Sequence, residues 1–314
     1  MPRVTVVVPA FNAAAFIAAT FNSVLTGRQQ DLEICVIDDG PTDATAEVAS
    51  GCGPIGGSSL ASSGKVRVLR QSNRGLSVSR NRGIEQSDSD FVALLDADDL
   101  WHPAKLDLQL AVLDAQPETG LCYSEFFAWD GLSPPAFVKD LDTRLDDSLS
   151  GWIYPKMLLT NYVLPSSSVF RRSALQTLGP LLCDDQQTDD WEYTVRASRL
   201  FPFAKLAAPL VAYRQSPGSL SRRPRRENVT ELMRDSLIAR FGLSSPQGGH
   251  VDMAELARRR HKGWCDFAIT HLTHGDLATG ASVFGRLVRT GPHRAHTALT
   301  AAKALGRRLM PSVR

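Results

Sequence analysis

A short run of acidic residues directly after an apolar segment is the first place in this sequence where side chains could do chemistry. Residues 91–95 are uniformly apolar, and Asp96, Asp98 and Asp99 follow them. The apolar run predicts a buried strand, and sheets of this type bind ligands outside the carboxyl ends of their strands. Crowded carboxylates repel one another unless a cation lies between them, and Mg²⁺ is held by one or two carboxylates plus substrate phosphates. The run therefore indicates either a divalent-cation site or a solvated acidic turn that caps the next helix.

Three further polar clusters follow predicted strands, and each has a plain explanation when taken alone. Residues 9–12 form a turn with an aromatic ring, residues 38–43 contain acids able to cap a helix, and residues 71–75 lead into Arg80. Together they would meet at one edge of a parallel sheet, where the strands have their carboxyl ends. The ring and turn of residues 9–12 could flank a flat base there, and a carboxylate of residues 38–43 could accept the imide N–H of a uracil.

Alternating strand and helix patterns predict the elements that would position these clusters. The predicted strands cover residues 4–8, 33–37, 66–69 and 91–95, and the predicted helices cover residues 13–25, 42–49 and 76–85. Repeated strand–helix units predict an α/β fold with a Rossmann-like, mostly parallel sheet and helices on both faces. Further elements are predicted at residues 103–115 (helix), 121–127 (strand), 153–159 (helix), 166–170 (strand), 191–199 (helix) and 204–213 (strand).

The charge distribution divides the chain into two predicted parts. Residues 1–221 carry 18 Lys and Arg against 26 Asp and Glu, whereas residues 222–314 carry 17 against 7. We therefore predict an α/β domain over residues 1–221 and a basic, all-helical region over residues 222–314. A basic region of this kind suits nucleic acid or an anionic membrane surface. Its last predicted helix, residues 295–310, either lies in a membrane interface or packs on its neighbours with a solvated basic face.

Two consecutive helices are predicted inside the basic region. Gly275 and Asp276 supply a C-cap and an N-cap in succession, which separates one helix from the next. The predicted apolar faces are formed by Trp264, Ala268 and Leu272 in the first helix and by Leu277, Ala281, Phe284 and Val288 in the second.

Composition excludes several classes of protein. The chain is 43% hydrophobic and 22% charged, as in ordinary globular proteins, and no stretch reaches the roughly 18 apolar residues of a membrane-spanning helix. The five cysteines are scattered without CxxC spacing, which argues against a disulfide framework and a zinc site and for a reducing, cytoplasmic location. The N-terminus runs directly into a strand-like segment, so we expect no signal peptide.

The clusters together resemble a known family. VVVPAFN (residues 6–12), VIDDGPTD (36–43), NRGLSVSRN (73–81) and LDADD (95–99) are similar, in order and spacing, to the successive signatures of family 2 glycosyltransferases. The resemblance covers roughly residues 3–215. It implies a GT-A fold, a nucleotide-sugar donor, a divalent cation (Mn²⁺ or Mg²⁺) and inversion at the anomeric carbon.

The resemblance also implies roles for individual residues on the donor side. Pro9, Ala10 and Phe11 match the turn that contacts the base and the ribose, and Asp39 matches the carboxylate that reads the base. Gly75 matches the loop near the nucleotide.

Arg80 and the acidic run complete the implied donor site. Arg80 matches the start of the helix near the nucleotide and would be available to a phosphate. Asp96, Ala97 and Asp98 match the DxD motif. Asp98 is our first choice for direct metal contact, Asp96 would lie nearer the ribose, and Asp99 is a second candidate ligand.

The catalytic base is expected later in the chain. Residues 188–196 resemble the acidic pair of the family, which opens a helix that carries an arginine six residues on. Inversion by a single displacement needs a carboxylate that takes the proton of the acceptor hydroxyl. We predict Asp190 in this role with Asp189 as the alternate, and we expect the helix amides to keep its pKa low. Alternatively, both acids only cap the helix. Trp191 either floors the acceptor site or belongs to the core.

Two departures from the family pattern stand out. Pro41 replaces the usual serine, which a turn accepts. A histidine that many relatives have near Ser216, where it helps to bind the metal or the diphosphate, is absent. Arg214, or the pair Arg222 and Arg223, could neutralise the diphosphate instead.

The leading hypothesis is a metal-dependent inverting glycosyltransferase that acts in cell-surface polysaccharide synthesis. It would move a sugar, with UDP favoured by Asp39, to a glycan or lipid-linked acceptor. The enzyme would be cytoplasmic, peripheral at the inner face of the plasma membrane. Two alternatives remain open: a catalytically inactive glycosyltransferase-like binding protein, suggested by the missing histidine, and a nucleic-acid-associated protein. The basic helices lack an aromatic stacking platform, so we expect no nucleic-acid partner.

Overall fold

The computed structural model of the protein describes residues 1–40, 42–51, 65–133, 135–183, 189–215, 224–290 and 300. The chain forms two compact units. The first consists of residues 1–157, 161–215 and 245–247, and the second of residues 158–160, 216–244 and 248–314. The predicted boundary after residue 221, and all but residue 300 of the predicted helix at residues 295–310, fall outside the described residues.

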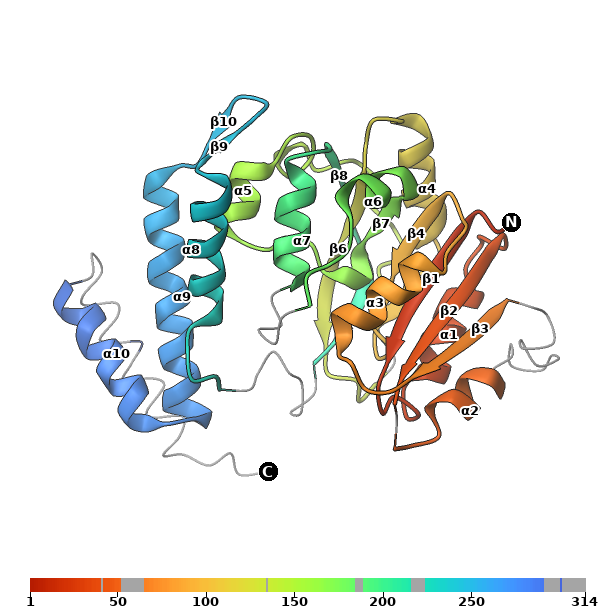
Figure 1. The fold of residues 1–314 in the computed structure, drawn as a ribbon, viewed down its shortest axis with the longest axis horizontal. Helices are drawn as coiled ribbons and strands as arrows, with labels where there is room; N and C mark the ends of the chain where they lie inside the picture. The colour runs from red at the N-terminus through yellow and green to blue at the C-terminus, as the bar shows by residue number, and fades with distance from the viewer. Residues whose placement is uncertain are drawn as a thin grey trace. The chain divides into compact units, whose positions relative to one another are not determined.

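The first unit is built on an eight-stranded sheet with the strand order β3-β2-β1-β4-β7-β6-β8-β5 (Figure 1). β7 is antiparallel to β4 and β6, and β5 is antiparallel to β8; the other pairings are parallel. Six strands therefore have their carboxyl ends at one edge, as the prediction of a mostly parallel sheet required. The strands are β1 (Val4–Ala10), β2 (Leu32–Asp39), β3 (Val66–Gln71), β4 (Phe91–Leu94), β5 (Leu100–Trp101), β6 (Leu121–Trp129), β7 (Val169–Arg171) and β8 (Phe203–Arg214).

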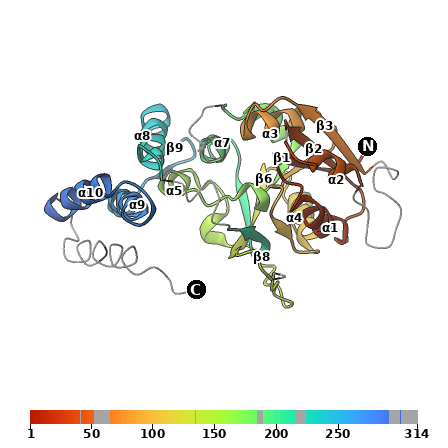
Figure 2. The same cartoon turned by 90° about the horizontal axis from the view of Figure 1, so that it is seen from below.

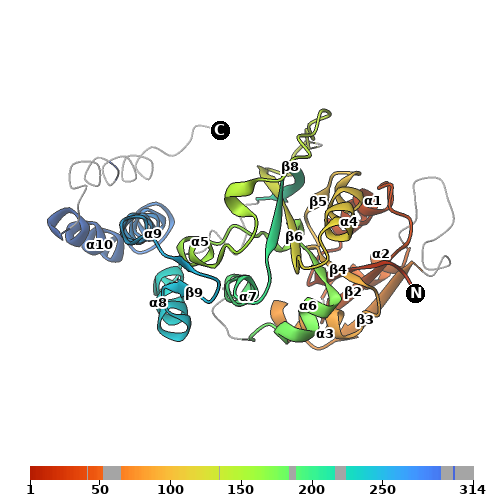
Figure 3. The same ribbon diagram turned by 90° about the horizontal axis from the view of Figure 1, so that it is seen from above.

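Helices cover both faces of this sheet, which explains why its central strands are continuous apolar runs. Figures 2 and 3 show α1 and α4 on one face and α3 on the other. All seven residues of β1 are buried. The helices of the unit are α1 (Ile17–Leu25), α2 (Thr45–Gly51), α3 (Leu76–Glu85), α4 (Lys105–Ala115), α5 (Tyr154–Leu159, whose last two residues belong to the second unit), α6 (Arg172–Leu178) and α7 (Asp189–Ser198).

The second unit is helical apart from a two-stranded ribbon. Its elements are α8 (Val229–Phe241), β9 (Ser244–Ser245, whose last residue belongs to the first unit), β10 (Gly249–His250), α9 (Met253–His274) and α10 (Leu277–Thr290), and α8 and α9 lie side by side (Figure 1).

The caps predicted between the last two of these helices are confirmed. Gly275 is the C-cap of α9, and the Asp276 carboxylate accepts the Thr279 N–H at 2.9 Å. The predicted apolar face of α10 is partly wrong, because Leu277 and Ala281 are exposed. The buried face is formed by Gly280, Val283, Phe284 and Leu287.

A fully buried lysine lies in the core of the first unit. Lys105 is the first residue of α4, and its Nζ lies 3.9 Å from the centre of the Trp101 ring. Among the described residues, Nζ has no hydrogen-bond partner. Burial lowers the pKa of Lys105 to about 7, because an apolar environment disfavours the ammonium form.

Replacing Lys105 by Met should stabilise the protein at mildly acidic pH and have less effect in alkaline solution. The unfolded chain keeps the lysine proton up to a pH of about 10.4, whereas the folded chain releases it near pH 7. The unfolded state therefore binds more protons between these values, so the wild type gains stability as the pH rises. We expect Lys105→Met to raise the free energy of unfolding by about 3 kcal/mol below pH 7, measured by urea denaturation.

Lys139→Met, at an exposed position, is the matched control, and we expect it to change the free energy of unfolding by less than about 0.5 kcal/mol at any pH. A gain from Lys105→Met that is the same below pH 7 and near pH 10 would contradict this explanation, since it would show that packing alone is responsible.

Candidate active site

Asp39, at the end of β2, organises the loop that leads into α3. Its carboxylate accepts hydrogen bonds from Gln71 Nε2 at 2.7 Å and from the backbone N–H groups of Arg74 and Gly75, both at 2.9 Å. Gly75 has φ +88°, a left-handed conformation that favours glycine. In the described part of the chain, Asp39 Oδ2 accepts one hydrogen bond, which leaves one acceptor position on this oxygen for a ligand.

The end of β1 lies at the same edge of the sheet. Pro9 and Ala10 are buried, whereas Phe11 is 51% exposed. Asn12, in a left-handed conformation, accepts the Thr42 N–H at 2.9 Å through Oδ1, which ties the ends of β1 and β2 together. The exposed Phe11 ring is therefore held on a fixed turn, as stacking on a base would require.

Arg80 links α3 to the end of β4. The residue is 3% exposed, and its Nη2 donates to Asp96 Oδ1 at 2.6 Å. Helix α3 can lie close enough for this contact because residue 83 is a glycine. A Cβ at this position would lie 2.3 Å from Val7 of β1. The pair commits one guanidinium nitrogen, and the phosphate contact that the resemblance implied stays a prediction.

Asp99 is fully buried and holds the acidic turn together. Its Oδ2 accepts from Ser166 Oγ at 2.5 Å, and its Oδ1 accepts the Arg214 N–H at 2.9 Å. Ser166 Oγ in turn accepts the Asp96 N–H at 3.0 Å. Burial and the neighbouring carboxylates of Asp96 and Asp98 raise the pKa of Asp99 well above its usual range.

Asp98 is the more open member of the turn. It is partly exposed, and no side chain in the described part of the chain donates a hydrogen bond to its carboxylate. Burial and the charge of Asp96 raise the pKa of Asp98 to about 6. Among the described residues, no three His, Cys, Asp or Glu side chains converge into a metal-binding set. The turn therefore offers one or two carboxylates rather than a complete cage.

Arg214, the last residue of β8, lies beside this turn. Its guanidinium carbon is 4.1 Å from the centre of the Trp129 ring and 4.8 Å from that of Phe16, so the group is held between two aromatic rings. Its Nε donates to the backbone oxygen of Asp98 at 2.9 Å. The guanidinium thus fixes a positive charge next to the acidic turn. Arg222 and Arg223, the other candidates for this role, lie outside the described residues.

Asp190 is held by two donors at the start of α7. Its Oδ1 accepts the Trp191 N–H at 2.9 Å, and its Oδ2 accepts Asn161 Nδ2 at 3.1 Å. Burial raises the pKa of Asp190, and the charge of Arg80 opposes this rise. The prediction of a low pKa is wrong, because burial outweighs the helix amides. Asp189 is buried and accepts a hydrogen bond from Ser77 Oγ of α3.

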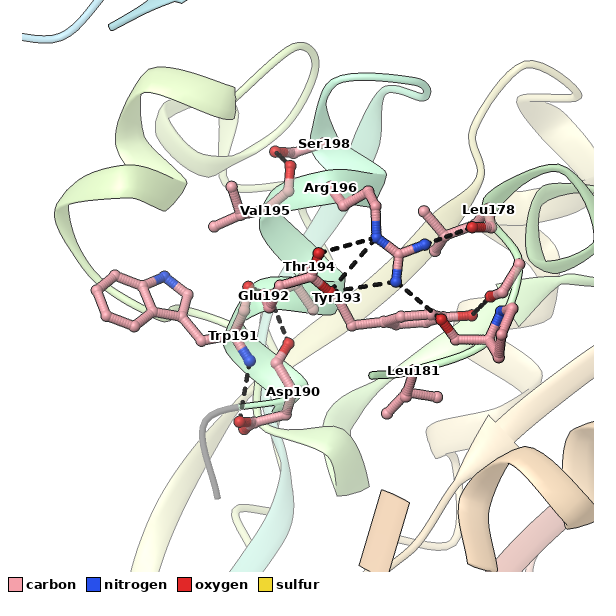
Figure 4. A network of polar contacts seen from close by, with 12 residues as sticks. Leu178, Leu181, Asp190, Trp191, Glu192, Tyr193, Thr194, Val195, Arg196 and Ser198 are labelled. Atoms are coloured by element: carbon pink, nitrogen blue, oxygen red, sulfur yellow. Dashed lines mark hydrogen bonds and ion pairs between the residues drawn. The ribbon is translucent and has the colours of Figure 1, made fainter. Parts of the chain in front are cut away.

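Contacts further along α7 fix the helix in place (Figure 4). Arg196 donates to Glu192 and to the backbone oxygens of Leu178 and Pro180. This arginine is therefore structural.

Trp191, which we considered as a possible contact beneath the acceptor sugar, belongs to the core. It is 4% exposed, and its Nε1 donates to the Met157 backbone oxygen at 2.7 Å.

Comparison with known proteins places the chain in a family. The sequence matches the family described as "Glycosyl transferase family 2" over residues 5–178, more than half of the chain. The chain belongs to glycosyl transferase family 2. It is also 27% identical to the amylovoran biosynthesis glycosyltransferase AmsB of Erwinia amylovora over 289 residues, which are 88% of this chain and 80% of AmsB. For several other curated relatives, the matched part is about half of the relative's length or less.

Solved structures agree with the family at the level of the fold. TarS 1–349 of S. aureus, solved in complex with UDP-GlcNAc, superposes with a TM-score of 0.62 at 15% identity, covering 98% of this chain and 89% of TarS 1–349. The mannosyltransferase PcManGT of Pyrobaculum calidifontis, solved with GDP-Man and Mn²⁺, gives 0.62 at 18% identity, covering 98% and 87%. The predicted family, GT-A fold and helical C-terminal extension are confirmed, and the predicted enzyme class is confirmed at the level of the family. In the described residues, no helix is both long and apolar enough to cross a membrane.

Sequence reasoning missed two residues that hold the candidate site together. Ser166 fixes the acidic turn, but it belongs to a run of serines that we interpreted as part of a strand; the run instead forms the short 3₁₀ helix Pro165–Ser167. Asn161 bonds to Asp190 from 29 positions away, and no local pattern marks it. The assigned roles of the predicted donor, metal and base residues stay predictions.

Replacing Ser166 by Ala should destabilise the fold more than replacing its neighbour Ser167. The first change removes the donor to a buried carboxylate, and we expect it to lower the free energy of unfolding by about 2–3 kcal/mol. Ser167 Oγ donates only to the Leu164 backbone oxygen, so Ser167→Ala should cost about 1 kcal/mol. Urea denaturation near neutral pH measures both. A loss from Ser166→Ala no larger than that from Ser167→Ala would show that the Asp99 contact is dispensable.

Proposed function

We propose that the protein is a metal-dependent, inverting glycosyltransferase that moves a sugar from a nucleoside diphosphate donor to a hydroxyl group of a glycan or lipid-linked acceptor. One observation carries this proposal: the buried Arg80 guanidinium pairs with Asp96 of the DxD motif and also acts on the charge of Asp190. An inverting displacement needs the acidic turn with Asp96 and the base Asp190 near one another, because the base must face the carbon from which the diphosphate departs.

On the donor side, we assign UDP as the nucleotide. The free acceptor position on Asp39 Oδ2 suits the imide N–H of uracil, and the exposed ring of Phe11 suits stacking on the base. Pro9, Ala10 and Gly75 would supply backbone next to the base and ribose, and Ala97 would do so beside the acidic turn.

For the cation, Mn²⁺ or Mg²⁺, we propose Asp98 as the first ligand and Asp96 as the second. The residues fit, because Asp98 is partly exposed and a cation would stabilise its carboxylate against burial and against the charge of Asp96, which together raise its pKa. When bound, the cation supplies positive charge for the departing diphosphate. Asp99 would support this turn rather than bind the metal, since both of its oxygens accept hydrogen bonds. Arg214 would add a fixed positive charge on the diphosphate side.

We propose Asp190 as the general base that takes the proton of the acceptor hydroxyl. Its raised pKa suits this role, because a base works best when its pKa lies near the operating pH. Asp189, the alternate, is buried against Ser77. That contact supports a structural role for Asp189.

The relatives support a nucleotide-sugar donor and a role in polysaccharide synthesis; they do not identify the donor sugar or the acceptor of this chain. TarS was solved with UDP-GlcNAc and PcManGT with GDP-Man and Mn²⁺, so neighbours of this fold bind nucleotide sugars. AmsB is named for amylovoran biosynthesis, which supports a role in polysaccharide synthesis.

We also propose that the basic second unit docks on an anionic membrane surface. Vesicle sedimentation tests this: removal of residues 292–314 without loss of binding would contradict it.

The proposal predicts metal-dependent turnover of a nucleotide sugar. In a panel of UDP-glucose, UDP-GlcNAc and GDP-mannose, we expect a UDP-sugar with Mn²⁺ to raise the free energy of unfolding by about 2.7 kcal/mol at roughly 100 times its Kd. We expect the same donor to be hydrolysed slowly to UDP. Asp190→Asn should lower this rate by about 10²–10⁴-fold with donor binding retained. Asp98→Asn should abolish the stabilisation by Mn²⁺ with donor.

Glu118→Gln, at an exposed carboxylate on the same unit, is the matched control and should leave binding and hydrolysis unchanged. Full activity of Asp190→Asn would refute the assignment of the base. Binding without any hydrolysis in the wild type would favour the alternative of a catalytically inactive, glycosyltransferase-like binding protein.

A further inference from the structure

Three residues in the middle of the glycosyltransferase sequence belong to the helical unit. The chain follows the first unit up to residue 157, contributes residues 158–160 to the second unit, and returns to the first unit at Asn161. Whatever holds residues 158–160 in the second unit therefore also fixes the backbone from which Asn161 extends.

A buried arginine of α8 holds this three-residue segment. Arg234 is 3% exposed, and it donates from Nε to the Leu158 backbone oxygen at 3.3 Å and from Nη2 to the Leu159 backbone oxygen at 3.2 Å. It also forms an ion pair with Glu231, which is 2% exposed. The planar guanidinium holds five N–H donors in a fixed fork, so this one side chain keeps two carbonyls and a carboxylate in a set geometry.

Helix α9 packs against the same pair of charges. A Cβ at Gly263 would lie 2.3 Å from Glu231 Oε1, so only glycine allows α9 this close approach. Asn228 donates to the Gly263 backbone oxygen at 3.2 Å, and Arg259 Nη1 donates to Thr160 Oγ1 at 3.4 Å. Residues 158–160 are thus held from α8 and from α9.

Asn161, the next residue, connects this segment to the candidate base. Its Nδ2 donates to Asp190 Oδ2 at 3.1 Å, and its Oδ1 accepts the Val163 N–H at 3.2 Å, so both ends of the amide are fixed. Among the described residues, the backbone N–H groups of Asp190 and Trp191 and the charges of Arg80 and Asp96 also act on this carboxylate. Among these, Asn161 is the neutral side chain that selects one orientation of the carboxylate.

We propose that Asn161 is a positioning residue for Asp190, and that Arg234 of the helical unit sets the place of Asn161 by holding the carbonyls of Leu158 and Leu159. The proposal rests on the proposed function, in which Asp190 is the base.

Two measurements on Asn161→Ala test the first step. The titration of the Asp190 carboxyl carbon is followed by NMR in protein labelled with ¹³C at aspartate, with Asp190→Asn as the assignment control. Loss of a donor to the charged form should raise the pKa of Asp190 by about one unit. With the best nucleotide sugar of the panel above and Mn²⁺, kcat should fall by about 10–100-fold, while KM for the donor stays within about twofold.

Arg234→Lys tests the second step, because lysine keeps the charge beside Glu231 but lacks the planar fork of donors that holds both carbonyls in place. We expect the same rise in the pKa of Asp190 and a fall in kcat of about 3–10-fold, again with an unchanged KM. Should Arg234→Lys fail to fold, the double variant Arg234→Met with Glu231→Leu removes both buried charges and should give the same signature. Arg260→Ala is the control, since it breaks the exposed Arg260–Asp235 pair of the same helices and should change neither quantity.

The outcomes separate this inference from the function on which it rests. An unchanged Asp190 titration in Asn161→Ala overturns the positioning role, and an unchanged titration in Arg234→Lys and the double variant overturns the link to the helical unit. A fall in kcat accompanied by an equal rise in KM would point to a general loss of structure and would also overturn it. If the titration shifts as expected but the wild type hydrolyses no nucleotide sugar, the proposed function fails instead.

Discussion

The site depends on one buried guanidinium. Arg80 pairs with Asp96 and opposes the raised pKa of Asp190, so one positive charge compensates carboxylates from two separate parts of the chain. A buried charge is tolerated only when it is paired. Arg80, Asp96 and Asp190 therefore depend on one another for their places in the folded chain. The arrangement relies on Gly83, which lets α3 approach β1, and on Ser166, which fixes the turn that carries Asp96.

Burial gives the acids of this site different properties. Asp98, with a pKa raised to about 6, keeps an open carboxylate, whereas Asp99 is enclosed and uses both oxygens to hold Ser166 and Arg214. Asp39 is fixed by three donors and organises the loop before α3. Carboxylates of one type can therefore differ in openness and in proton affinity, according to their surroundings.

Local patterns predicted much of the fold and of the candidate site. Helix α3 spans residues 76–85 as expected, and the caps at Gly275 and Asp276 are where the residue types indicated, because caps and periodicity depend on neighbouring residues. The acidic turn and Asp190 were also singled out from local patterns, and their roles stay predictions. Contacts between distant segments could not be predicted: the pairing of Asn161 with Asp190, the partner of Arg80 and the buried face of α10 all depend on packing. The pKa of Asp190 was predicted in the wrong direction, since burial is a property of the folded chain.

The most direct test of the account is a crystal structure of the full chain with UDP and Mn²⁺, with data collected at the manganese absorption edge. We predict an anomalous peak within coordination distance of the Asp98 carboxylate, with the diphosphate of UDP on the same cation and Asp190 on the open side of the site. Bound UDP with no peak beside residues 96–99, or a peak held by other residues, would contradict it.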